Sequence, residues 1–310
     1  MSHAMVFLNP QCNYGTGRAR WEALNESLEK RFGRFQMVEI RSPVALVDRV
    51  SKAVADGGSF LVAAGGDGTV NLLMNAIMEA QVADKVTIGA VGLGSSNDFH
   101  KPFRPKLMLG GTPLRLDVTR AERCDLIRVE HESPVGELSV RHCLINASIG
   151  ITAEGNFIFN RRLSFIQAIQ RLSVNAAVMI AALKAIFSYR DIPCRLAIDG
   201  GEEKAMLMSN LGVIKRPHFA GGLCYDTAIE PADGKLGINI YRDLTLSERI
   251  KALVAFQRGR FRGRYKALSW TGSHLTVKSN RVFVLELDGE VVKARAVRFL
   301  VVPSAVRCCR

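Results

Sequence analysis

The segment best suited to chemistry is a glycine-rich turn, FLVAAGGDGTVN over residues 60–71. Glycines let backbone N–H groups approach a ligand closely, and the start of a following helix adds a positive dipole end. The pattern is typical of a phosphate cradle. Asp67 inside it would repel phosphate, which predicts an intervening cation such as Mg²⁺. The alternative is an ordinary strand–helix turn with Thr69 as its N-cap.

Two other polar turns also follow strand-like runs, NPQCNYGTG over residues 9–17 and GLGSSNDF over residues 92–99. Because the carboxyl ends of neighbouring parallel strands meet at one edge of a sheet, we expect the 92–99 turn to lie beside the 60–71 turn. The three turns together favour a nucleotide site over three separate solvated loops. Neither GxxxxGK[ST] nor GxGxxG occurs, which excludes a P-loop and a dinucleotide fingerprint.

The elements that must position these turns alternate between short apolar runs and helical patterns over the first 120 residues. Such alternation predicts βαβ units and a mostly parallel, doubly wound (Rossmann-like) α/β domain. The strand-like runs are Met5–Leu8, Phe35–Ile40, Phe60–Ala64 and Val86–Val91, and the helical stretches are about 19–31, 44–54 and 70–79.

Beyond about residue 124 the pattern changes to strands with few helices, which predicts an antiparallel β-sandwich domain. The strands are expected at 125–130, 138–145, 193–198, 205–214, 236–241, 275–278 and 282–287. We therefore place an α/β domain at 1–124 and a β-rich domain at 125–296, with the active site in the cleft between them. Residues 297–310 are expected to pack back onto the first domain, with Val297–Val302 as the returning strand.

One long helix interrupts the β-rich half. Apolar residues at 165, 169, 172, 176, 179, 183 and 186 step by four and three, which predicts one broad apolar face. That face is interpreted as core, with the lining of an acyl-chain cleft as the alternative.

Composition narrows the partners. The 310 residues carry 42 basic and 29 acidic side chains, a net charge of +13, which indicates nucleic acid, an anionic membrane or a polyphosphate. Seven scattered cysteines without CxxC spacing predict reduced thiols and a cytoplasmic protein. The longest apolar stretch, 174–187, is too short to span a bilayer, so any membrane association is expected to be peripheral.

These residues resemble a known family. GGDGT at 65–69 with Asn71 is similar to the signature of diacylglycerol, sphingosine and NAD kinases and, more loosely, phosphofructokinases. Asn9-Pro10, GSSNDF at 94–99 and LDGE at 287–290 resemble the lipid-kinase branch. Gly221-Gly222 followed by DGKL at 233–236 is similar to the second domain of bacterial soluble lipid kinases.

The resemblance implies an ATP- and Mg²⁺-dependent lipid kinase and assigns roles by position. The implied nucleotide-binding residues are Asn9, Ser42, Gly65, Gly66, Asp67, Gly68, Thr69, Asn71, Ser95 and Asn97. Asp67, Asp98 and Asp125 match a Mg²⁺–water network. Glu290, with Asp288 beside it, matches the base that takes the proton of the lipid hydroxyl. Asp233, with backbone carbonyls at Glu230 and Lys235, matches a structural Mg²⁺ site.

The chemistry is consistent with these roles, because phosphoryl transfer needs positioning, charge neutralisation and one base for the alcohol. A dense basic segment, Arg258, Arg260, Arg262, Arg264 and Lys266, is predicted to contact anionic lipid headgroups, with a solvated surface run as the alternative. Most of the surplus charge is expected on the second domain.

The expected partners are ATP and a lipid such as diacylglycerol at an anionic membrane, with no nucleic acid; a homodimer is left open. The rival functions are an NAD kinase-like phosphotransferase and a non-catalytic nucleotide- or anion-binding protein.

Overall fold

The structure is a computed structural model that describes residues 4–161 and 174–310. The chain divides into two compact units, residues 1–125 with 303–310 (unit 1) and residues 126–302 (unit 2). Asp125, expected to open the second domain, therefore belongs to unit 1. The return to unit 1 begins at Pro303 rather than at residue 297.

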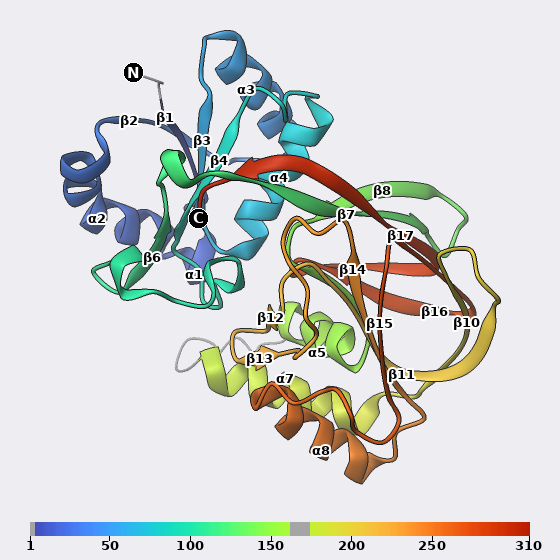
Figure 1. Ribbon diagram of the computed structural model, residues 1–310. Coiled ribbons are helices and arrows are strands. Elements are labelled where there is room, and N and C mark those ends of the chain that lie inside the picture. Colours follow the sequence, from blue (N-terminus) through green and yellow to red (C-terminus); the bar gives the residue numbers. More distant parts are fainter. Residues whose placement is uncertain (1–3, 162–173) are drawn as a thin grey trace. The chain divides into compact units, whose positions relative to one another are not determined.

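Unit 1 alternates strands and helices through its first 92 residues (Figure 1). The elements are β1 (Ala4–Leu8), α1 (Cys12–Gly15), α2 (Gly17–Phe32), β2 (Phe35–Glu39), α3 (Pro43–Ala55), β3 (Phe60–Gly65), α4 (Asp67–Glu79) and β4 (Thr87–Gly92). Short strands β5 (Met108–Leu109) and β6 (Thr112–Arg115) follow, with 3₁₀ turns at 98–100, 105–107 and 118–120.

The sheet of unit 1 has the order β4-β3-β1-β2 with every neighbouring pair parallel. Trp21, Leu24 and Leu28 of α2 pack with the even-numbered residues of β1, Val6 and Leu8. Helix α4 also contacts β3 and β4 but contributes no residue to that cluster, so it covers the opposite face. A parallel sheet covered on both faces explains why β3 and β4 are buried along their whole length.

Unit 2 is mainly antiparallel. Its elements are β7 (Glu122–Glu132), β8 (Leu138–Cys143), β9 (Asn146–Gly150), α5 (Ile151–Asn160), α7 (Val174–Ser188), β10 (Ile192–Ile198), β11 (Lys204–Ile214), β12 (His218–Phe219), β13 (Leu223–Cys224), β14 (Leu236–Arg242), α8 (Leu246–Gln257), β15 (Ala267–Gly272), β16 (His274–Leu287) and β17 (Glu290–Cys308). Strands β7 and β17 have residues in both units.

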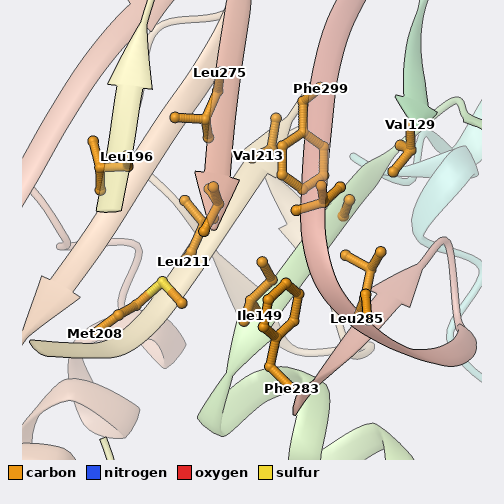
Figure 2. Packing of buried hydrophobic residues seen from close by; sticks show 14 of the residues in the cluster. Val129, Ile149, Leu196, Met208, Leu211, Val213, Leu275, Phe283, Leu285 and Phe299 are labelled. Carbon is orange, nitrogen blue, oxygen red and sulfur yellow. The ribbon is translucent and has the colours of Figure 1, made fainter. Parts of the chain in front are cut away.

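The strand order of unit 2 is β15-β14-β11-β10-β16-β17, with β7 and β8 continuing from β17. The long strands β11 and β16 pair with β10 at one end and with β9 at the other. Inward side chains of these strands and of β17 enclose one apolar core, which includes Ile149, Leu211, Leu285 and Phe299 (Figure 2).

Several expectations for the β-rich half need correction. The strands expected at 275–278 and 282–287 are one strand, β16, with an irregular register between Lys278 and Phe283. Residues 297–300 pair with β16, and the pairing with β4 is made by Arg307 and Cys308. Helices α5 and α8 lie where few helices were expected.

The helix predicted over 165–186 corresponds in part to α7, and its first residues lie outside the described part of the chain. Of the predicted apolar face, Met179 and Leu183 are exposed, while Ala177, Ala181 and Ala185 are buried. Ile186 of the predicted face is buried, so the interpretation as core is confirmed there. It is wrong for Met179 and Leu183, because α7 otherwise packs through its alanines. No helix among residues 4–161 and 174–310 is long and apolar enough to cross a membrane.

Candidate functional site

The glycine-rich turns of unit 1 meet at one edge of its sheet, as expected from their order. The turn after β3 touches the turn after β4, since a Cβ on Gly94 would lie 2.4 Å from the Gly66 Cα. The turn after β1 joins them because Asn9 Nδ2 donates to Thr69 Oγ1 at 3.1 Å. The chain thus gathers glycines and small polar side chains at the start of α4, where the helix dipole favours an anion.

The glycines here are required by space. A Cβ on Gly65 would lie 2.2 Å from Thr69 Oγ1, well inside van der Waals contact. Gly66 is the N-cap of α4 and no side chain caps that helix, so the positive end of its dipole is not covered by a capping side chain. Thr69 is inside α4 rather than its N-cap, so the ordinary-turn alternative does not describe this helix start.

Asp67 ties two turns together. Its Oδ2 accepts the backbone N–H of Asp98 at 3.0 Å, and its Oδ1 accepts the N–H of Phe99 at 2.9 Å. Asp98 in turn forms an ion pair with Lys101 at 2.7 Å, and both side chains are about nine-tenths buried. The structure therefore gives both aspartates a role in holding the second turn against the first.

The third predicted acidic residue, Asp125, is 1% exposed and accepts the N–H of Ser304 at 2.8 Å. Among residues 4–161 and 174–310, no three His, Cys, Asp or Glu side chains are grouped so that they could hold a metal ion. The predicted trio therefore does not form a protein-only metal cage. Mg²⁺ often binds through one or two carboxylates, water and substrate phosphates, and Asp67 and Asp98 fit that chemistry.

Other predicted nucleotide residues have structural partners of their own. Ser42 is the N-cap of α3, and its Oγ accepts the N–H of Ala45. Asn71 is 7% exposed and accepts from Asn75 at 3.0 Å. Asn97 organises its turn from a left-handed backbone (φ 50°), because its amide bonds the backbone of residues 92 and 94. Ser95, at the tip of that turn, is exposed.

Sequence reasoning missed Arg20. Its guanidinium, projecting from α2, donates to the carbonyl of Leu93 and, at 3.5 Å, to that of Gly94. It therefore brings a positive charge to the same glycine-rich edge. Nothing in the local pattern of residues 18–21 marks it, since α2 has charged residues at many positions.

In unit 2, Asp288 is not a candidate base. It is 4% exposed, and its carboxylate accepts three backbone N–H groups, from Leu144 at 2.6 Å, Ile145 at 3.0 Å and Asn146 at 2.8 Å. A carboxylate that is buried and bonded in this way stabilises the turn instead of taking up a proton. The assignment of Asp288 beside Glu290 as catalytic is corrected to a positioning role.

Glu290 has the opposite environment. It is exposed at the first residue of β17, directly after the turn that Asp288 holds. The carbonyl of Gly289 accepts from Asn156 and Asn160 of α5 at 3.3 and 3.1 Å, and the Gly289 N–H donates to Glu286 at 2.6 Å. The turn is thus fixed on both sides while the Glu290 carboxylate stays accessible.

Glu154, also on α5, is a second residue that the sequence did not reveal. Burial raises the pKa of its carboxyl group, and the opposing charges of Lys293 and Arg161 only partly offset this. A half-buried carboxyl with a raised pKa is a frequent property of functional sites. Glu154 is the only glutamate of the apolar helix α5, so no sequence motif marks it.

The predicted structural Mg²⁺ site is occupied by a lysine. The Lys215 ammonium lies 2.7 Å from Asp233 Oδ1 and 2.7 Å from the carbonyl oxygen of Lys235. The side chain of Lys215 is 1% exposed. Asp233 also accepts the N–H groups of Glu230 and Lys235, both at 3.0 Å, and these bonds together with Lys215 hold the pKa of its carboxyl below the usual value despite partial burial.

Four residues of the basic segment, Arg258, Arg260, Arg262 and Arg264, are exposed. Lys266 is not available in the same way: its side chain is 16% exposed, and its ammonium bonds Glu248 at 3.0 Å and the carbonyl of Asp243. The inclusion of Lys266 in a membrane contact is therefore corrected.

The charge surplus is uneven, as expected. Unit 2 holds 25 basic and 16 acidic residues, a surplus of 9, whereas unit 1 holds 17 and 13, a surplus of 4. Unit 1 also has a groove of about 570 Å³ lined by Arg104, Pro105, Lys106, Leu107, Arg120, Glu122 and Arg310. None of the predicted nucleotide residues lines this groove.

Comparison with known families matches both parts of the chain. Residues 3–130 match the "Diacylglycerol kinase catalytic domain", and residues 158–310 match the "YegS C-terminal NAD kinase beta sandwich-like domain". A curated relative from Xanthomonas oryzae pv. oryzae, named "Probable lipid kinase YegS-like", is 28% identical over 273 residues, which are 83% of this chain and 81% of the relative.

Solved structures share the fold. A diacylglycerol kinase from Bacillus anthracis superposes with a TM-score of 0.68 at 11% identity, over 99% of this chain and 96% of that one. A yeast NADH kinase superposes with a TM-score of 0.53 at 11% identity, over 99% of this chain and 83% of that one. At such identities the likeness concerns the fold alone, and the fold by itself does not separate lipid from NAD(H) as the acceptor.

Proposed function

Because the chain belongs to the diacylglycerol kinase-like family of lipid kinases, we propose that it transfers the γ-phosphate of Mg²⁺-ATP to the hydroxyl group of a lipid such as diacylglycerol. The observation that carries the proposal is the glycine cradle of unit 1, at residues 65–69 and 92–97. Unit 2 separately presents one exposed carboxylate, Glu290, on a firmly held turn.

In this mechanism unit 1 holds the phosphate donor. The glycine-rich start of α4, with its positive dipole end, and the exposed turn at Ser95 receive the phosphates of ATP. Mg²⁺, when bound with the nucleotide, neutralises charge that develops on the transferred group. Asp67 and Asp98 are the carboxylates suited to that ion, and Asn9 keeps the Thr69 side chain in place.

Unit 2 activates the acceptor. Glu290 takes the proton from the lipid hydroxyl as the hydroxyl oxygen attacks the γ-phosphorus. The bond from that phosphorus to the bridging oxygen breaks, and ADP leaves with the electron pair. Asp288 and the α5 asparagines Asn156 and Asn160 act through the backbone, because they fix the turn from which Glu290 projects.

The test is phosphate transfer from radiolabelled ATP to a panel of defined lipids, with NAD and NADH as further acceptors, read by thin-layer chromatography. Transfer to a lipid that is lost in Glu290→Gln supports the proposal. Transfer to NAD or NADH alone would replace it with the NAD kinase-like alternative. Nucleotide binding without transfer to any acceptor would indicate a non-catalytic binding protein.

A further inference from the structure

The buried lysine of unit 2 stands where the family resemblance implies a structural metal ion. The resemblance implies three ligands for Mg²⁺: the Asp233 carboxylate and the backbone carbonyls of Glu230 and Lys235. The Lys215 ammonium contacts the first and the last of these at 2.7 Å. We propose that Lys215 permanently replaces the metal, so that this loop of unit 2 is stabilised by an internal cation and needs no Mg²⁺.

Charge and space both support this replacement. An ammonium carries three N–H donors, and the two oxygens accept them at ordinary hydrogen-bond distance. Lys215 is 1% exposed and its Nζ lies against Asp233 Oδ1 and the carbonyl oxygen of Lys235. A divalent ion could bind these two oxygens together only if the ammonium left its buried position. A buried charge without its partner is strongly unfavourable, so that exchange is opposed.

The consequence is a division of labour between cations. The proposed catalysis uses Mg²⁺ with ATP in unit 1, whereas the fold of unit 2 is independent of Mg²⁺. A folding measurement without nucleotide therefore tests the inference separately from the proposed activity.

The experiment compares full-length protein in chelator and in millimolar Mg²⁺. We expect no retained Mg²⁺ after desalting and a melting temperature that changes by less than about 1 °C. A stoichiometric Mg²⁺ together with a fall of more than about 5 °C in chelator would overturn the proposal. This measurement decides the question even if a variant fails to fold.

Lys215→Met and Lys235→Met form a matched pair, because each removes one ammonium but only Lys215 uses it at the site. Lys235 is exposed and contributes its backbone, which the substitution keeps. We expect Lys215→Met to lower the melting temperature by at least about 5 °C and Lys235→Met to leave it near wild type. Equal effects in the two variants would contradict the role given to Lys215.

A second, independent observation concerns the outer surfaces of α7 and α8. Large apolar side chains recur every fourth residue on each helix and face solvent, with exposed fractions between 36% and 64%. We call these six residues the apolar face: Met179, Leu183, Phe187, Leu246, Ile250 and Val254. In an ordinary surface helix the large apolar residues face the core, whereas α7 buries three alanines and Ile186 and exposes three large apolar side chains.

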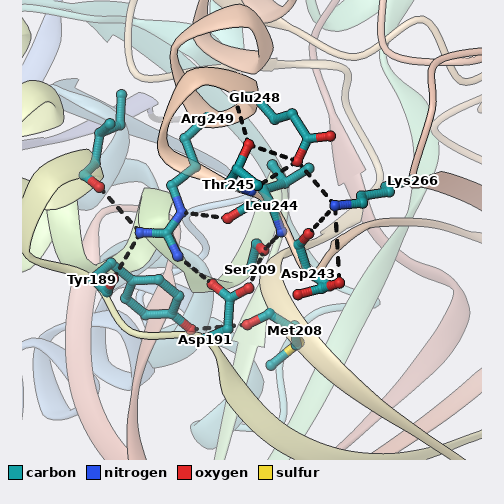
Figure 3. A network of polar contacts seen from close by, with 11 residues as sticks. Tyr189, Asp191, Met208, Ser209, Asp243, Leu244, Thr245, Glu248, Arg249 and Lys266 are labelled. Carbon is teal, nitrogen blue, oxygen red and sulfur yellow. Dashed lines mark hydrogen bonds and ion pairs between the residues drawn. The ribbon is translucent and has the colours of Figure 1, made fainter.

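The two helices contact each other, and polar bonds join α8 to the end of α7 (Figure 3). Arg249 of α8 donates to the carbonyls of Ile186 and Tyr189 at the end of α7 at 3.2 and 2.7 Å. The same guanidinium pairs with Asp191 at 2.6 Å, and Asp191 accepts from Ser209 at 2.7 Å.

Positive charge borders this apolar face. Lys184 and Lys251 are exposed next to the rows, and the row on α8 continues after four residues to Arg258, the first member of the basic segment. The acidic residue of α8, Glu248, is held by its capping box and by Lys266. Apolar side chains bordered by lysine and arginine are complementary to an anionic bilayer, with its acyl boundary and negative headgroups.

We infer that the apolar face docks unit 2 on anionic lipid bilayers. Docking would bring the proposed lipid kinase to an acceptor that lies in the membrane. Only this purpose, and not the binding itself, rests on the proposed function. Binding to vesicles needs neither ATP nor turnover, so the two proposals can fail separately.

The test is co-sedimentation with vesicles of phosphatidylcholine alone or mixed with phosphatidylglycerol. The variant Leu183→Gln with Phe187→Gln and Ile250→Gln is compared with a control, Val135→Gln with Leu138→Gln. Val135 lies in the turn before β8 and Leu138 is the first residue of β8, and they are 80% and 81% exposed. We expect at least tenfold weaker binding for the first variant, roughly the effect of losing 1.4 kcal/mol of apolar transfer, and unchanged binding for the control.

Binding of the wild type should need phosphatidylglycerol and weaken with salt. Equal loss in both variants, or no loss in the first, would overturn the inference. If the wild type is a dimer and the first variant is a monomer with unchanged vesicle binding, the apolar face contacts a second copy of the chain. That result would reject the membrane as its partner.

Discussion

The contrast between Asp288 and Glu290 gives the sharpest prediction, because two acidic residues one glycine apart have opposite environments and are proposed to have opposite roles. The perturbation is Asp288→Asn. The shape is kept, and asparagine tolerates the left-handed backbone of Asp288 (φ 46°) as well as aspartate does, so no strain is added. What changes is the charge and one acceptor atom.

The magnitude follows from the three bonds to this carboxylate. In either orientation of the new amide, at least one buried N–H faces an NH₂ group and loses its acceptor, which costs about 2 kcal/mol. The remaining bonds lose their charge assistance at about 1 kcal/mol each. We therefore expect the free energy of unfolding of unit 2 to fall by about 4 kcal/mol.

The assay is urea unfolding followed by the fluorescence of Trp270, which packs against the core of unit 2, in a Trp21→Phe background that silences the other of the two tryptophans. Glu290→Gln is the control: because Glu290 is exposed, its unfolding free energy should change by less than about 0.5 kcal/mol, while turnover falls by about 10²-fold or more. A loss below about 1 kcal/mol for Asp288→Asn would refute the positioning role.

Three further predictions concern the glycine cradle, the α7–α8 junction and pH. Gly94→Ala places a Cβ 2.4 Å from the Gly66 Cα, so ATP affinity measured by calorimetry should fall by at least about tenfold. Unchanged affinity would show that this turn is not part of the nucleotide site. Arg249→Met leaves Asp191 without its buried partner and should lower the free energy of unfolding, measured in urea, by about 3–5 kcal/mol. A change below about 1 kcal/mol would contradict this role. Burial, helped by a nearby arginine, lowers the pKa of His142 to about 4. Between pH 6.5 and 4 the unfolded chain therefore binds a proton at His142 that the folded chain does not bind. As the pH falls through this range, the free energy of unfolding decreases by up to about 1.4 kcal/mol per pH unit. His142→Gln should flatten that slope, and an unaltered slope would assign it to other groups.

The turns of unit 1 could be predicted because their determinants are local and repeated. An apolar strand, glycines and a helix start recur in order, and parallel strands bring their carboxyl ends to one edge. The contact of Gly66 with Gly94 and the bond from Asn9 to Thr69 follow from that rule. Helix α8 could not be found in the same way, because its large apolar side chains face solvent and its buried ones are mostly small.

Residue types alone did not separate acidic residues that act from those that hold the fold. Asp288 and Glu290 are both carboxylates in one tight turn, yet one accepts three buried N–H groups and the other is exposed. Similarly, Asp233 with nearby carbonyls indicates a metal site until Lys215, 18 residues earlier, is seen to contact the same oxygens. Such pairings depend on strand register, which brings distant residues together and leaves no local signal.

By itself the sequence determined the family, the parallel first unit with its glycine-rich edge and the β-rich second unit, and it led to the proposal of a phosphotransferase. These follow from short-range patterns, since glycine, alternation and hydrophobic period act over a few residues. Only the tertiary structure decided which carboxylates are buried, which cation meets Asp233 and which side of α7 faces solvent. Burial and partner choice are properties of packing between segments far apart in the chain, so no local pattern records them.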